Sequence, residues 1–323
     1  MKTNKHINNV ISTDRREWRN HRHLNLSELF GGDFSTSLEM TIVFVFALLL
    51  TSCSKHDVLG VFMSFDETPN DRFAESMEYN SYHGYDVITG MPNTYRVYAM
   101  SDVHVEGSTH NLDRYVADYL ADTTAAPFSL CLGDLIYGKN GFVKFCEHVK
   151  PVTDAERKIY YTVGNHDLYF GQWNDFYTRF GASTYWFEVQ TVGGYKDLFI
   201  ALDSGSGTLG LDQRDWLEDL LKSKYNQGYR NIIVFTHTHF FRTNNVNGTT
   251  SSFGMEETYD LADLFDRYDV RLVVQGHSHH RDYRMFKSVG YLRLGALKES
   301  SDDPCYVKLK IGNTLDYQFI QIY

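Results

Sequence analysis

A pair of histidines separated by one residue follows a buried apolar run near the C-terminal end of the sequence. Val273 and Val274 lead into Gly276-His277-Ser278-His279. A strand that stops at two imidazoles can deliver nitrogen ligands to a metal site. Histidines at a strand end can also be satisfied by a backbone carbonyl or by water, so this motif alone leaves both interpretations open.

Other segments also place Asp, Asn or His directly after an apolar, strand-like run. Their polar ends are Asp102-Val103-His104, Gly133-Asp134, Gly164-Asn165-His166-Asp167 and His237. In open α/β sheets, ligands collect at the carboxyl ends of the strands. We therefore expect these side chains to lie close together. Such mixed nitrogen and oxygen donors suit Zn, Mn, Fe or similar ions rather than Ca or an all-thiolate site.

The elements that must position these residues follow a regular order. Three consecutive units of strand, loop and helix are predicted from apolar periodicity. The predicted strands cover residues 95–100, 128–132 and 158–163, and the predicted helices cover residues 112–120, 142–149 and 173–180.

The second half of the chain predicts a change of sheet type. An antiparallel pair joined at Gly193-Gly194 is followed by alternating helices and strands. The predicted strands cover residues 184–192, 198–203, 231–235, 270–275, 282–286, 291–293, 306–311 and 315–323, and the predicted helices cover residues 211–221 and 256–268. Residues 242–254 are predicted as a polar loop at the rim of the site.

In order and spacing, these strand-end residues resemble the five-motif signature of the calcineurin-like metallophosphoesterases, a group that includes purple acid phosphatases and many phosphodiesterases. The resemblance extends over residues 95 to about 285. It implies an α/β fold, a four-layer α/β/β/α sandwich of two mixed β-sheets flanked by helices. It also implies a binuclear metal site at the carboxyl ends of the strands.

The resemblance assigns the ligands to two metal ions. One ion would take Asp102, His104 and His279, and the other would take Asn165, His237 and His277. Asp134 would bridge the two ions, and a carboxylate is suited to that role because it has two anionic oxygens. Two divalent ions, two Asp ligands and a bridging hydroxide leave the site positive, which attracts a phosphate ester.

The implied reaction is hydrolysis of a phosphoric mono- or diester by a metal-bridging hydroxide, with no covalent enzyme intermediate. By resemblance, His166 hydrogen-bonds a phosphoryl oxygen or protonates the leaving alkoxide, and Asp167 orients its imidazole. His239 departs from the family pattern, because relatives often have proline there, and its role stays open. Asp203 and Gln213 are interpreted as structural residues.

Length and composition predict an ordinary globular protein, with one large α/β domain or two small ones. The chain has 323 residues, 42% of them hydrophobic, and a formal net charge of -10. This charge and the lack of a basic tract argue against a nucleic-acid surface. The four cysteines are scattered without CxxC spacing, so the sequence indicates neither a zinc knuckle nor a disulfide framework.

The N-terminal segment predicts export. Residues 1–39 are polar and are interpreted as an unstructured or mis-assigned leader, and residues 40–53 as a signal h-region and lipobox that ends at Cys53. A lipid on Cys53 would anchor the protein to a membrane of the bacterial cell envelope, on the periplasmic or outer surface. A short buried strand is the alternative interpretation of this segment. Residues 54–93 are predicted as a lead-in, with one short helix at 73–79, and residues 94–323 as the catalytic domain.

The leading hypothesis is therefore a lipid-anchored, metal-dependent phosphoesterase. An alternative is a catalytically weak, metal-containing surface protein that binds a phosphorylated glycan or lipid. A structural zinc protein is disfavoured, because such sites use four Cys or His ligands rather than a bridging Asp and an Asn. The sequence does not distinguish a monoesterase from a diesterase, nor does it identify the metals or the oligomeric state.

Overall fold

The computed structural model describes residues 67–241 and 253–323. The predicted leader, the apolar segment and Cys53 lie outside these residues, as does most of the predicted loop at 242–254. In the part of the chain that is described, no helix is long and apolar enough to cross a membrane.

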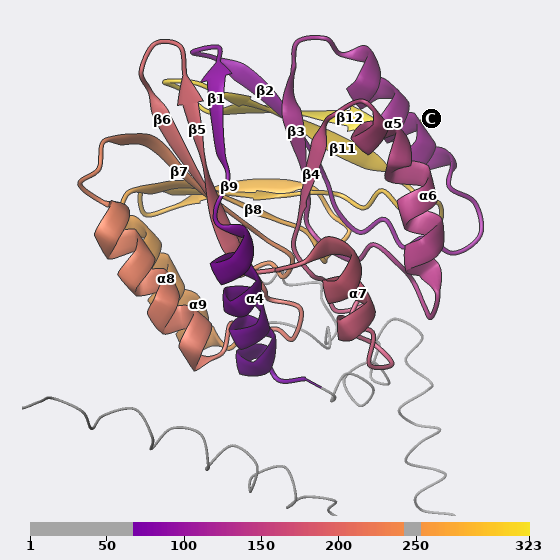
Figure 1. Cartoon of the computed structure of the whole chain (residues 1–323), viewed down its shortest axis with the longest axis horizontal. Coiled ribbons are helices and arrows are strands. Elements are labelled where there is room, and N and C mark those ends of the chain that lie inside the picture. The colour runs from indigo at the N-terminus through magenta and orange to yellow at the C-terminus, as the bar shows by residue number, and fades with distance from the viewer. Residues whose placement is uncertain (1–66, 242–252) are drawn as a thin grey trace, which may run out of the picture. The chain divides into compact units, whose positions relative to one another are not determined.

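Two mixed β-sheets form the centre of the fold (Figure 1). The smaller sheet has the order β12-β11-β2-β3-β4, and the larger sheet has the order β1-β5-β6-β7-β8-β10-β9. The strands of the smaller sheet are β2 (Tyr95–Met100), β3 (Ala125–Cys131), β4 (Lys158–Tyr161), β11 (Cys305–Ile311) and β12 (Asp316–Gln321). Those of the larger sheet are β1 (Val87–Met91), β5 (Tyr185–Thr191), β6 (Lys196–Leu202), β7 (Tyr229–Thr236), β8 (Val270–Gln275), β9 (Asp282–Phe286) and β10 (Val289–Arg293).

Helices cover the outer faces of the two sheets, so the predicted four-layer sandwich is confirmed. The smaller sheet packs against α5 (His110–Ala121), α6 (Gly141–Asp154) and α7 (Trp173–Phe180). The larger sheet packs against α8 (Leu211–Lys224) and α9 (Met255–Arg267). A third apolar cluster fills the space between the sheets.

Strand β2 shows how the sequence supplies two of these cores. Val97 and Ala99 lie in the core between the sheets, whereas Tyr98 and Met100 lie in the core beneath the helices. Successive side chains of a strand point to opposite faces. A strand buried on both faces therefore needs apolar residues at consecutive positions, which is the pattern of Val-Tyr-Ala-Met at residues 97–100.

The segment before residue 94 contains more structure than the sequence predicted. The short predicted helix is α4 (Pro69–His83), which begins at a capping box formed by Thr68 and Asp71 and ends at Gly84. Strand β1 was not predicted. It pairs in parallel with β5 at the edge of the larger sheet, and most of its residues are not fully buried. An edge strand of this kind lacks the apolar alternation that predicts a strand.

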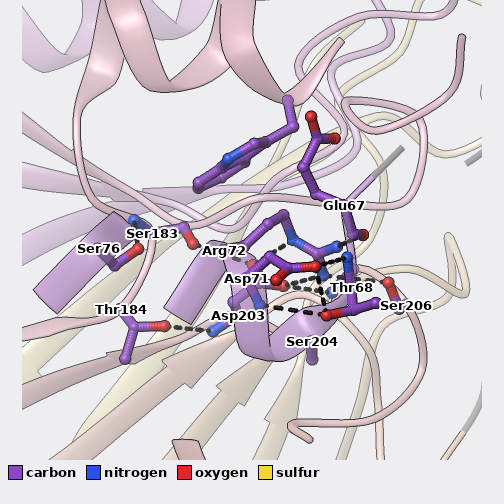
Figure 2. A network of polar contacts seen from close by, with 12 residues as sticks. Glu67, Thr68, Asp71, Arg72, Ser76, Ser183, Thr184, Asp203, Ser204 and Ser206 are labelled. Carbon is purple, nitrogen blue, oxygen red and sulfur yellow. Dashed lines mark hydrogen bonds and ion pairs between the residues drawn. The ribbon is translucent and has the colours of Figure 1, made fainter. Parts of the chain in front are cut away.

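A buried ion pair attaches α4 to the end of β6 (Figure 2). Arg72 donates to both carboxylate oxygens of Asp203, at 2.8 and 3.1 Å, and both side chains are almost fully buried. Asp203 also accepts from Ser183, and the neighbouring Ser204 accepts from Thr236 and Thr238. Thr236 and Thr238 flank His237, so the network extends from α4 to the two neighbours of a predicted metal ligand.

Replacing Arg72 with methionine should lower the free energy of unfolding by about 3 to 5 kcal/mol, because Asp203 would be left as an unpaired buried charge. Denaturant unfolding followed by circular dichroism measures the change. Lys150→Met is a suitable control, since its partner Asp154 and Lys150 itself are both exposed and such pairs contribute less than about 1 kcal/mol. A loss for Arg72→Met no larger than that for the control would contradict the assigned role.

Candidate metal centre

The predicted site residues all follow strands whose carboxyl ends lie at one edge of the sandwich. Strands β2, β3 and β4 are parallel neighbours in one sheet, and β7 and β8 are parallel neighbours in the other. Backbone hydrogen bonds join the loops that follow them: His104 N–H donates to Asp134 O at 2.9 Å, and Gly276 N–H donates to His237 O at 2.8 Å. The structure therefore brings together all seven predicted ligands.

Five of these seven ligands have a left-handed backbone conformation. Their φ angles are 54° for Asp102, 48° for His104, 54° for Asp134, 72° for His277 and 58° for His279. Non-glycine residues rarely adopt such angles, and they cluster at functional sites. The backbone here is shaped to turn these side chains toward one another.

The glycines of the motifs are required by close contacts. A Cβ atom at Gly276 would lie 1.9 Å from Ser101 Oγ, and one at Gly164 would lie 2.2 Å from Asp134 Oδ1. Both distances are far below van der Waals contact. Glycine at these two positions therefore allows the loops to approach the carboxylates of Asp102 and Asp134.

The first group of ligand atoms consists of Asp102 Oδ1, His104 Nε2, His279 Nε2 and Asp134 Oδ2. His279 Nε2 lies 3.3 Å from Asp102 Oδ1 and 3.2 Å from His104 Nε2, and His104 Nε2 lies 3.4 Å from Asp134 Oδ2. Asp102 Oδ1 is buried and has no hydrogen-bond partner among the described residues. These four side chains converge on one point.

The second group consists of Asn165 Oδ1, His237 Nε2, His277 Nδ1 and the same Asp134 Oδ2. Asn165 Oδ1 lies 2.9 Å from His277 Nδ1 and 3.1 Å from His237 Nε2. His237 Nε2 lies 3.1 Å from His277 Nδ1 and 3.4 Å from Asp134 Oδ2. A single oxygen of Asp134 thus belongs to both groups, which is the arrangement that a bridging carboxylate needs.

These separations fit two transition-metal ions. With metal–ligand bonds of about 2.1 Å, neighbouring ligands of a tetrahedral ion lie about 3.4 Å apart. Asn165 Nδ2 donates to Tyr169 Oη at 2.6 Å and His237 Nδ1 lies 2.8 Å from Leu132 O, so the opposite atoms of both side chains face the group as acceptors. Acceptors that face one another favour a cation between them, either a shared proton or a metal ion.

Outer contacts hold the two carboxylates in place. Asp102 Oδ2 accepts from Ser101 Oγ at 2.6 Å and from His277 N at 2.9 Å, which leaves Oδ1 for the metal. Asp134 Oδ1 accepts from His166 N at 2.8 Å, which leaves Oδ2 as the bridge. Such outer contacts orient metal ligands in proteins. Neither Ser101 nor Tyr169 was predicted from the sequence as part of the site.

Burial and neighbouring charges prepare the ligands for a cation. Burial lowers the pKa of His104 to about 3 and that of His277 to about 4, so both imidazoles are neutral at pH 7. Burial alone would raise the pKa of Asp134, but the charges of His237 and His166 hold it well below the usual range. Burial would lower the pKa of His237, but the charge of Asp134 raises it to about 9. A metal ion bound there would displace a proton from His237, the usual coupling of metal binding to deprotonation.

His166 lies beside the centre, where it was predicted to act on the substrate. A ring nitrogen of His166 lies within 4.8 Å of the ligand atoms of His104 and Asp134. Its Nδ1 lies 3.3 Å from Tyr137 O, which belongs to the loop after β3. A phosphoryl group bound at the first ion would therefore lie within reach of His166.

The contacts of Asp167 differ from the predicted ones. Its role was predicted as orienting the imidazole of His166. Instead, its carboxylate accepts backbone N–H groups from Asp134 at 2.9 Å, Leu135 at 2.8 Å and Gly164 at 2.9 Å. Asp167 thereby ties the loop that carries Asp134 to the loop that carries Asn165. The acidic residue of this motif is thus a positioning residue for the bridging carboxylate.

His239 is buried next to the second group. Its ring lies 5.6 Å from the ring of His277, and neither of its nitrogens has a hydrogen-bond partner among the described residues. Burial lowers the pKa of His239 to about 3, so the ring is neutral. The structure thus places His239 behind a metal ligand and not among the converging atoms.

Comparison with known proteins agrees with this geometry. A model of the calcineurin-like phosphoesterase family matches residues 95–281. The chain therefore belongs to the calcineurin-like phosphoesterase family, which confirms the resemblance seen in the motifs. Membership supports a metal-dependent phosphoesterase as the general class. No protein with a curated description matches the chain.

Several solved structures share the fold at low sequence identity. A dimetal phosphatase from Danio rerio is 12% identical with a TM-score of 0.55, and the match covers 71% of this chain and 96% of that one. A purple acid phosphatase from yellow lupin is 15% identical with a TM-score of 0.55, covering 72% and 52%. GAP50 of Plasmodium, described as the anchor in the inner membrane complex, is 14% identical with a TM-score of 0.54, covering 71% and 84%.

Proposed function

We propose that this chain hydrolyses phosphoric mono- or diesters, with an activated water as the nucleophile. The observation that carries the proposal is the convergence of seven side chains on two points that share Asp134 Oδ2. A pair of divalent cations held there supplies a water of lowered pKa and neutralises charge on the phosphoryl oxygens. Mn, Zn and Fe all suit this donor set.

The side chains of the site have two further roles. The metal ligands, and the residues that hydrogen-bond to them, fix the positions at which charge is neutralised. His166 holds a proton beside the site and donates it to the leaving oxygen. The new bond joins the water oxygen to phosphorus, the bond from phosphorus to the ester oxygen breaks, and the proton released by the water passes to solvent.

Hydrolysis of paired chromogenic phosphate monoesters and diesters tests the proposal. The full chain is freed of metal with a chelator, and Mn, Zn or Fe is added back singly and in pairs. We expect no turnover by the chelated protein and recovery with at least one metal. Failure of every metal to restore hydrolysis, in protein that contains two ions per chain, would contradict the proposal.

The same assay distinguishes a phosphoesterase from the alternative, a protein that binds its ligand without turnover. A catalytically weak surface protein would bind a phosphorylated glycan or lipid without releasing phosphate or alcohol. The retention of all seven ligands and of His166 supports turnover. Binding of such a ligand by the metal-loaded protein with no detectable product would favour the alternative.

We also propose, from the sequence of residues 40–53, that the protein is exported and lipid-anchored in a bacterial cell envelope. Cys53 follows the apolar run at the position of a lipobox cysteine. The wild-type protein should fractionate with membranes and carry a lipid mass on Cys53, and Cys53→Ser should abolish the lipid and release the protein. Mass spectrometry and membrane fractionation measure both results. An unmodified Cys53 in a membrane-free protein would refute the anchor.

A further inference from the structure

A hollow of about 280 Å³ lies next to the metal centre, between the loop after β2 and the loop that leads into α6. Its walls include Val105, which directly follows the ligand His104, and Tyr137, which lies three residues after Asp134. Two lysines and one glutamate supply its charges: Lys139, Lys144 and Glu106. The hollow is thus a positive pocket on a chain whose formal net charge is -10.

Tyr137 connects the hollow to the reacting groups. Its ring stacks on the imidazole of His166, with centroids 5.5 Å apart and an interplanar angle of 30°. The same ring lies 6.1 Å from the ring of the ligand His104. Although it touches both histidines, Tyr137 is 54% exposed. Its free face is therefore available to a flat group bound in the hollow.

Phe170 extends the exposed aromatic surface at this place. It comes from the loop after Asp167, has a φ of 63° and is 42% exposed. The ammonium of Lys139 lies 5.3 Å from the centroid of its ring. Non-glycine residues with such backbone angles cluster at ligand-binding and active sites. Lys139 thus lines the same hollow as Tyr137 and also contacts Phe170.

The position of His166 indicates which part of a substrate reaches this hollow. The oxygen that leaves phosphorus must face His166 to receive its proton. The group attached to that oxygen then extends beyond His166, over the stacked ring of Tyr137. Aromatic faces favour planar rings, and ammonium groups favour anions.

We propose that the hollow is the leaving-group subsite and takes an alcohol with a planar ring and a second negative charge. This inference rests on the proposed function, because it names the substrate class of the same site. Tyr137 stacks on the ring, and Lys139 pairs with the second charge. Lys144, whose ammonium donates to Gly107 O, adds to the positive potential from the wall of the hollow.

The test compares two esters that differ in one charge. The metal-loaded full chain hydrolyses 3-carboxyphenyl phosphate and 3-carbamoylphenyl phosphate, which share the ring and the ester bond. We expect kcat/KM to favour the carboxylate by about threefold to fivefold, as for a charge pair at an exposed site. The preference should fall as salt is added. Lys139→Gln should bring the ratio close to one, whereas Lys150→Gln, which removes an exposed charge farther along α6, should leave it unchanged.

A second pair of variants tests whether the aromatic ring of Tyr137 stacks on the leaving group. Tyr137→Leu should lower kcat/KM for both aryl esters by about twofold to tenfold, and Tyr137→Phe should restore it. The backbone carbonyl that His166 contacts is present in both variants. The proposed subsite would be contradicted if the wild type hydrolysed the carboxylate and the amide ester with equal kcat/KM. It would also be contradicted if Lys139→Gln and Lys150→Gln changed the ratio of the two kcat/KM values equally.

A binding measurement tests the leaving-group subsite independently of the proposed hydrolytic activity. The alcohols 3-hydroxybenzoate and 3-hydroxybenzamide are titrated into metal-free protein and followed by ligand-observed NMR. Preferred binding of the benzoate that depends on Lys139 supports the subsite even if no ester is hydrolysed. Hydrolysis of both esters with no preference in either measurement overturns the subsite and leaves the proposed function standing.

Discussion

The variant His166→Ala should turn over substrate about 10²- to 10⁴-fold more slowly than the wild type, the usual contribution of a general acid or base. It should still contain two metal ions per chain. His166 lies close to the ligand atoms of His104 and Asp134 but is not required by either convergent group. Loss of its ring therefore removes a proton donor and leaves both groups of ligands complete.

The dependence on the leaving group distinguishes this role from a structural one. An alkyl ester needs protonation of the departing oxygen, whereas a 4-nitrophenyl ester leaves readily as the anion. The loss in kcat should therefore be larger for the alkyl ester. His110→Ala, at an exposed position at the start of α5, is the matched control and should behave as the wild type. Equal losses with both esters, or unchanged turnover, would refute proton donation by His166.

Asp134→Asn should reduce the metal content from two ions per chain to one or fewer. Asp134 Oδ2 lies 3.4 Å from His104 Nε2 and 3.4 Å from His237 Nε2, so it serves both groups. The change removes one negative charge from a site with four imidazole ligands, of which His104 and His237 are buried and the other two are partly buried. Loss of an outer-shell partner already weakens metal binding by about 10- to 100-fold, and loss of a bridging ligand should weaken it more.

Elemental analysis after dialysis against a defined metal concentration measures this change. The control is Asp175→Asn, which removes the same charge from an exposed ion pair on α7. The variant and the control should have the same circular dichroism spectrum if folding is unaffected. A folded Asp134→Asn protein that still holds two ions would exclude Asp134 as the bridge.

The convergence of the site could be predicted from the sequence because it follows from topology. Parallel neighbouring strands end at the same edge of a sheet, so a polar residue after each apolar run is sufficient to predict a cluster. The positions of Asp102, Asp134 and His277 were therefore predictable without coordinates. The same reasoning predicted the order of most strands and helices from residue 95 onward.

The outer contacts could not be predicted, because they depend on side chains meeting across different loops. Tyr169 reaches Asn165 along one loop, but Leu132 O meets His237 only after the two sheets have packed. The role of Asp167 was interpreted from its position beside His166, whereas its oxygens accept backbone N–H groups of two loops. Sequence proximity was a poor guide there, since consecutive residues at a strand end point in different directions.

The lead-in segment was underestimated for a related reason. Its polar composition predicted a surface segment, yet Arg72 is 1% exposed and pairs with Asp203, which is fully buried. An arginine is usually exposed unless it has a buried partner, and the partner here is 131 residues away in the sequence. This ion pair is connected to the site through Ser204, which follows Asp203 and accepts hydrogen bonds from the two residues beside His237. That connection could be recognised only in the structure.

The central claim is that seven side chains hold two ions that share one oxygen of Asp134. Anomalous diffraction from crystals grown with Mn, Zn or Fe tests it most directly. The account predicts two peaks in each chain, one beside Asp102, His104 and His279 and the other beside Asn165, His237 and His277, both in contact with Asp134 Oδ2. A single peak, or two peaks of which only one contacts Asp134, would contradict it.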